Sequence, residues 1–90
     1  MDRFSLEILE RTVQLAIEAM PPDENPRLVE CVVTILDYIK SPEAADERTL
    51  LPALTELLEL ARANHQFLIA ARLAPIVRQL CERGRNSDVA

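Results

Sequence analysis

Apolar residues recur every three or four positions along most of the chain, and prolines separate the stretches in which they do. The first stretch covers residues 3–20 and contains the series Leu6, Leu9, Val13, Ala16 and Met20. Steps of three and four residues return to the same side of a helix, whereas a strand alternates every two residues. The pattern therefore predicts a helix over residues 3–20. Pro21 ends it, because a proline disfavours helical geometry in the residue before it.

The second predicted helix begins at a proline. Asn25 and Pro26 are typical of a helix start, because asparagine caps the first turn and the N–H that proline lacks is not needed there. Apolar positions with helical spacing then continue as far as Ile39. The next break comes at Ser41 and Pro42, so we expect the second helix to end shortly before them.

The third predicted helix covers residues 50–63. Residues 41–47 are expected to form the linker before it, with room for one helical turn. Thr49 is the predicted cap, and Pro52 is tolerated because it falls in the first turn. Residues 64–66, Asn-His-Gln, are polar and mark the predicted break before the next helix.

The fourth predicted helix runs from residue 66 to residue 83, with Gly84 as a left-handed cap at its end. Pro75 interrupts the pattern, because its ring would clash with the carbonyl of Ala71. We therefore expect a kink or a split at Pro75. Residues 85–90 have too little apolar content to be held in place and are expected to be frayed.

Glycine occurs only once among the 90 residues. A chain with so few left-handed backbone positions cannot form many tight hairpins or a glycine-rich phosphate loop. The sequence thus predicts an all-α protein: a compact antiparallel bundle of four to five helices. Its length suits a single domain, which we place at residues 1–84.

The charge pattern argues against a nucleic-acid partner. The net charge is −5, and acidic groups are repelled by phosphates. The charge is uneven, however: residues 1–47 carry −7 and residues 48–90 carry +2. Nine of the ten basic residues are arginine, which a GC-rich genome alone would explain. The alternative is that the C-terminal half meets acidic groups through arginine side chains.

The first two helices have more apolar surface than one core can absorb. Projected at 100° per residue, their apolar arcs span about 220° and about 200°, against about 180° on the last two helices. A contiguous apolar strip exposed to water usually marks an interface. We predict a protein interface on this surface, formed by Leu6, Leu9, Val13, Ile17, Val29, Val33 and Leu36. The competing interpretation is that the 41–47 linker or the C-terminal tail covers it.

Groups for catalysis or metal binding are sparse. His65 is the only histidine, so the chain has no second histidine for a catalytic arrangement and no histidine-rich metal site. Cys31 and Cys81 lie in helical stretches without metal-ligand spacing, and we expect both to be buried and reduced. No apolar run approaches the roughly 18 residues that span a bilayer. We expect a cytoplasmic protein that is not an enzyme and has no cofactor, no metal and no membrane contact.

Two functions remain open at this point. The favoured one is a small protein-interaction module, such as an adaptor, a secretion-type chaperone or a regulatory subunit, acting as a homodimer or with a heteropartner. The alternative is a DNA-associated transcriptional regulator that uses the arginines of the C-terminal helices, for example Arg72 and Arg83, which share a face.

Overall fold

Four helices make up the described part of the computed structural model. It gives the backbone of residues 3–43 and 47–89 and the side chains of residues 3–43 and 48–82. The helices are α1 (Arg3–Ala19), α2 (Pro26–Lys40), α3 (Glu47–Ala63) and α4 (Phe67–Val89), and the described residues contain no strand. The all-α class is confirmed. The antiparallel order and a fifth helix stay predictions.

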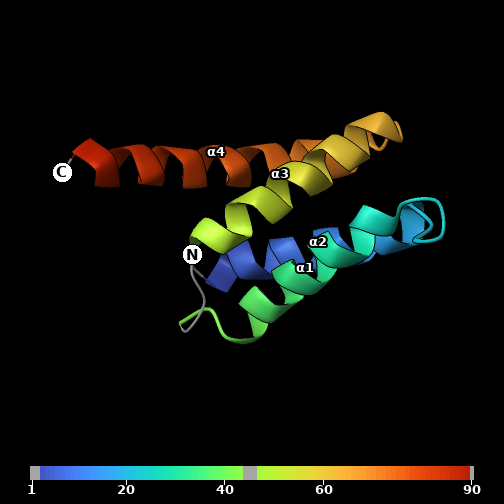
Figure 1. Cartoon of the computed structure of the whole chain (residues 1–90), viewed down its shortest axis with the longest axis horizontal. Helices are drawn as coiled ribbons and strands as arrows, with labels where there is room; N and C mark the ends of the chain where they lie inside the picture. Colours follow the sequence, from blue (N-terminus) through green and yellow to red (C-terminus); the bar gives the residue numbers. More distant parts are fainter. Residues whose placement is uncertain (1–2, 44–46, 90) are drawn as a thin grey trace.

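The helices enclose one core. α3 packs against α2 and α4, and α1 packs against α2 and α4 (Figure 1). The radius of gyration is 12.8 Å, close to the about 12 Å expected for a compact chain of this length. The largest fully buried side chains come from every helix: Leu9, Leu28, Ile35, Leu54, Leu57 and Leu73 are among them. The apolar residues that recur with helical spacing therefore face the core, as predicted.

Thr12 is the single polar residue that is buried among the described side chains. Its Oγ1 donates a hydrogen bond to the carbonyl oxygen of Ile8, one turn earlier, at 2.7 Å. This bond satisfies the hydroxyl within its own helix, so burying it carries no large penalty.

The first turn of α2 confirms the role of Pro26 and changes that of Asn25. α1 ends just before Pro21, and α2 starts at Pro26 with Asn25 in the N-cap position. The Asn25 side chain, however, makes no capping hydrogen bond. Its Nδ2 donates to the carbonyl of Pro21 at 3.2 Å, and its Oδ1 accepts from Nδ2 of Asn64 at 3.2 Å.

This Asn25–Asn64 bond ties two turns that lie 39 positions apart in the sequence. Asn64 also donates from its Nδ2 to the carbonyl of Leu60 at 2.8 Å. The turn that follows α1 and the turn that precedes α4 are therefore at the same end of the molecule. The end of α1 consequently lies near the start of α4.

α3 starts earlier than predicted. It begins at Glu47, so Thr49 is inside the helix and is not its cap. Pro52 accordingly lies beyond the first turn, in the helix interior. The backbone continues helically through both residues because α3 is held by its buried side chains, which outweigh a local start signal. The expected turn within the linker falls partly on residues 44–46, outside the described residues.

The break between α3 and α4 is confirmed, and its geometry is specific. His65 has a φ of 60°, in the left-handed region that favours glycine. The N–H of Gln66 donates to the carbonyl of Ala61 at 2.7 Å, and the N–H of His65 donates to the carbonyl of Arg62 at 3.1 Å. These two bonds form a Schellman motif, in which the residue after the helix end adopts the left-handed conformation. His65 occupies the position that a glycine usually fills.

The end of α4 differs from the prediction. α4 continues to Val89, so Gly84 does not cap it, and no described glycine has a positive φ. α4 also continues through Pro75, so of the two predicted alternatives the split is wrong, and the kink stays a prediction. Pro75 is exposed, which lets its ring point away from the packed side of the helix. The fraying of residues 85–90 stays a prediction, since their side chains lie outside the described residues.

Candidate interaction surfaces

The seven residues of the predicted interface do not form one surface. Leu9 and Val13 have no exposed area and belong to the core. They present nothing to a partner, so the prediction that they belong to the interface is wrong. The other five are at least partly accessible. Ile17, Val29 and Val33 are 41%, 48% and 52% exposed, respectively, and Leu6 and Leu36 are half-buried.

These five accessible residues belong to α1 and α2, two helices that pack against each other. Ile17 is about 180° from Ile8 in projection, and Ile8 faces α4. Val29 and Val33 are about 160° from Cys31, which faces α3. Ile17 therefore lies on the side of α1 away from α4, and Val29 and Val33 lie on the side of α2 away from α3. We call Leu6, Ile17, Val29, Val33 and Leu36 the α1–α2 strip.

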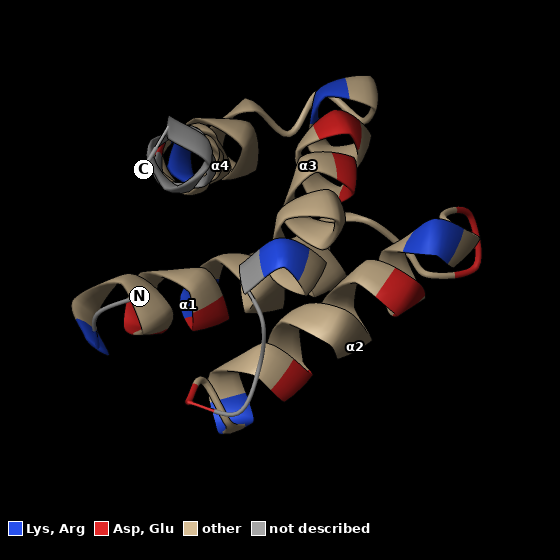
Figure 2. Ribbon diagram, turned by 60° about the vertical axis from the view of Figure 1, so that its left-hand side comes forward, with Lys and Arg blue, Asp and Glu red and all other residues tan. Residues whose placement is uncertain are grey.

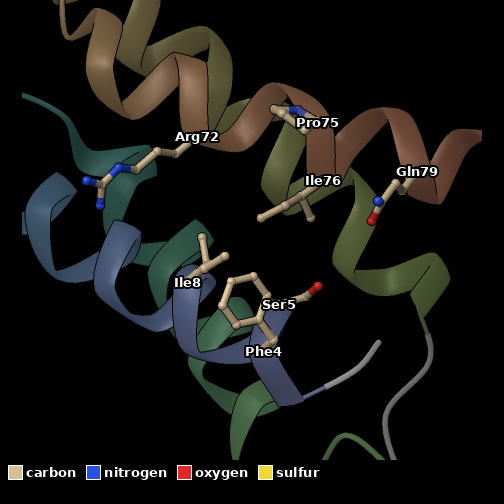
Figure 3. Close-up of a pocket in the computed structure, with 7 residues that line it drawn as sticks. All are labelled: Phe4, Ser5, Ile8, Arg72, Pro75, Ile76 and Gln79. Carbon is tan, nitrogen blue, oxygen red and sulfur yellow. The ribbon is translucent and has the colours of Figure 1, made fainter.

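A second apolar surface lies where α1 and α4 face each other. A groove of about 740 Å³ runs between them and is lined by Phe4, Ser5, Ile8, Arg72, Pro75, Ile76 and Gln79. In Figure 3, Ile76 extends from α4 toward Phe4 and Ile8 of α1. Phe4 is 69% exposed. The sequence pattern missed this groove, although Phe4 and Ile8 stood at one edge of the wide apolar arc of the first helix.

Charged side chains are spread over the outside of the helices. Figure 2 shows acidic residues on α1, α2 and α3. Arg27 Nη1 and Glu56 Oε1 are 3.5 Å apart and link α2 to α3. Both side chains are substantially exposed, so this pair contributes little to stability. Arg62, Arg72 and Arg78 are exposed, while the side chains of Arg83 and Arg85 are outside the described residues.

The two cysteines have different environments. Cys31 is buried, as predicted, whereas Cys81 is exposed, which corrects the prediction for Cys81. Burial raises the pKa of the Cys31 thiol from 9.0 to about 11, and the nearby carboxylate of Glu56 adds to the rise. A thiol with a raised pKa remains protonated at neutral pH and is a poor nucleophile. Cys31 thus behaves as a core residue.

No group of three His, Cys, Asp or Glu side chains that could hold a metal ion occurs among the described residues. Within residues 3–43 and 47–89, no helix is long and apolar enough to cross a membrane.

Comparison with known proteins does not place the chain in a family. No protein-family model matches it, and neither a curated protein nor a solved structure shows significant similarity to it.

Proposed function

We propose that the chain is a small protein-interaction module that binds a protein partner through the α1–α2 strip. Such modules serve as adaptors, secretion-type chaperones or regulatory subunits. The proposal keeps the antiparallel helix order and the cytoplasmic location predicted from the sequence, and it assigns no catalytic activity.

One observation supports the proposal most strongly. Ile17, Val29 and Val33 are large aliphatic residues, each about half exposed, and they lie on two helices that pack against each other. No described residue covers them. Single exposed apolar residues are ordinary, but a contiguous group of them usually marks an interaction site.

The strip's size indicates the kind of association. Completing the burial of a half-exposed aliphatic side chain stabilises a complex by about 1 kcal/mol. The three most exposed residues, with smaller contributions from Leu6 and Leu36, therefore give about 8 kcal/mol across a two-fold interface. Association costs at least about 4 kcal/mol. At that lowest cost a homodimer would have a Kd of about 1 mM, and tight binding requires a heteropartner that adds its own anchors.

Crosslinking at the strip tests the proposal. A photoactivatable residue at Val33 is compared with one at Glu59, which is also exposed but lies on α3. We expect Val33 to crosslink one discrete protein at endogenous levels and Glu59 not to do so. That protein is then purified and titrated. Val29→Ser with Val33→Ser should weaken its binding by at least tenfold, and Glu59→Ser should leave it unchanged.

Two results would contradict the proposal. One is the same diffuse set of crosslinks from Val33 and Glu59. The other is a purified partner whose affinity does not respond to the Val29→Ser and Val33→Ser changes.

A further inference from the structure

The groove between α1 and α4 has two walls with the same arrangement. On α1, Phe4, Ile8, Arg11 and Leu15 follow one another at steps of four, three and four residues. On α4, the same steps connect Leu68, Arg72, Pro75 and Gln79. Such steps keep residues on one edge of a helix. Each wall is therefore a row with one arginine, and the other three residues are all apolar on α1, whereas on α4 they are Leu68, Pro75 and the polar Gln79.

The ends of the two rows lie beside each other. Phe4 lies with Gln79 in the lining of the groove. Leu15 lies toward the end of α1, and the Asn25–Asn64 bond brings that end close to the start of α4, where Leu68 is located. Eleven steps of 1.5 Å from the first to the last residue make a row of about 16 Å, or three helical turns. Leu68 is 63% exposed, so the apolar surface extends beyond the lined groove.

Two arginines carry positive charge here in an acidic protein: Arg72 lines the groove, and Arg11 belongs to the row on α1. Both Arg11 and Arg72 are exposed, and neither has an ion-pair partner among the described residues. Each stands in the middle part of its row, with apolar residues on either side. In Figure 3, Arg72 extends beyond one end of the apolar lining. Arginine side chains hydrogen-bond carboxylates in a fixed, two-pronged geometry.

We infer that this groove binds an amphipathic helix of a partner protein, with an apolar face and acidic residues that meet Arg11 and Arg72. The length of the rows suits about three turns of helix, and helices commonly dock their apolar face into such grooves. A small molecule fits less well. Phe4, Arg72, Pro75 and Gln79 are all exposed, whereas sites for small ligands bury most of the ligand surface.

The inference concerns a different face from the α1–α2 strip and does not depend on it. Ile17 and Ile8 lie on opposite sides of α1. A substitution on one face can therefore be used as a control for the other.

A pair of synthetic peptides tests the inference. The acidic peptide is an amphipathic helix of about 18 residues, with leucines three and four apart and two glutamates beside them. The neutral peptide has glutamine in place of both glutamates. Binding is followed by NMR through the amide shifts of the full chain. We expect both peptides to shift Ser5, Ile8, Ile76 and Gln79, with the neutral peptide about three- to tenfold weaker, as two exposed ion pairs allow.

Four variants separate the contributions of the arginines and of the apolar lining. Arg11→Gln with Arg72→Gln should remove the preference for the acidic peptide while keeping the apolar binding. Arg78→Gln is the matched control, since Arg78 is exposed about 120° from Arg72 on α4 and should not change the preference. Phe4→Ser should weaken both peptides, and because Phe4 is exposed the fold should survive. Val33→Ser on the α1–α2 strip should have no effect.

Several outcomes would overturn the inference. These are equal affinity for the two peptides, binding of neither, or shifts that gather on the α1–α2 strip. Shifts of Phe4 and Leu68 that depend on protein concentration without peptide would assign the groove to a second copy of the chain. Shifts caused by dodecanoate but by neither peptide would assign it to a small ligand.

Discussion

Val13 and Val33 are the same residue type in two neighbouring helices, and the structure gives them opposite environments. Val13 has no exposed area, whereas Val33 is 52% exposed. Replacing each by glutamate therefore tests which side of each helix faces the core. The expected free-energy changes differ by several kcal/mol.

For Val13→Glu, two penalties add. Losing the buried aliphatic side chain costs about 2 kcal/mol. The carboxyl group would have to stay neutral, and burial can raise such a pKa by about 3 units, or about 4 kcal/mol at pH 7. The sum of about 6 kcal/mol rivals the whole stability of a 90-residue domain, roughly 5 to 13 kcal/mol. For Val33→Glu, the carboxylate remains in water and the change should stay within about 1 kcal/mol.

Urea denaturation followed by circular dichroism measures both variants. Val33→Glu should keep a cooperative transition with a midpoint within about 1 M of wild type, and Val13→Glu should lose most or all of its stability. If Val13→Glu were as stable as Val33→Glu, the assignment of the inner face of α1 would be wrong.

Three further predictions concern the α3–α4 turn, the buried thiol and DNA. His65→Gly should be more stable than His65→Ala by about 1 kcal/mol, because only glycine adopts a φ of 60° without strain. The control pair is Glu59→Gly and Glu59→Ala, inside α3, where the alanine variant should be the more stable. Thermal unfolding measures both pairs. The pKa of Cys31 is raised to about 11 from 9.0, so its contribution to the free energy of unfolding is fully present below pH 9. That contribution falls by up to about 3 kcal/mol as the pH rises to 11. Cys31→Ala should abolish this loss, as measured by urea titrations. Duplex DNA should not bind at physiological salt, and micromolar binding that weakens steeply with salt in fluorescence anisotropy would favour the regulator alternative.

The helices and most of the core could be predicted from spacing alone. Steps of three and four residues bring Leu9 and Val13 to one side of α1 wherever the helix packs. Boundaries were harder, because they depend on local signals that packing can override. Thr49 has the chemistry of a cap, yet α3 begins two residues before it. Gly84 could cap a helix, yet α4 passes through it.

The interaction surfaces could be predicted only in part. The apolar arc of α1 is too wide for one contact, but its width does not reveal which neighbours divide it. In the structure, the core takes the centre of the arc, the groove beside α4 takes the edge with Phe4, and Ile17 lies exposed on the other edge. The groove joins α1 to α4, and its lining residues on the two helices are more than 60 positions apart in the sequence. No local pattern reports such a pairing.

The central claim is that the α1–α2 strip associates with protein, and its weak self-association offers the most direct measurement. Methyl NMR spectra of the full chain are recorded from about 0.05 to 1 mM, around the Kd of about 1 mM worked out above. The methyl signals of Ile17, Val29 and Val33 should move together with concentration, while those of the buried Ile35 stay fixed. Val33→Glu should remove the effect. Movement confined to other surfaces, or movement of the strip signals that persists in Val33→Glu, would contradict the account.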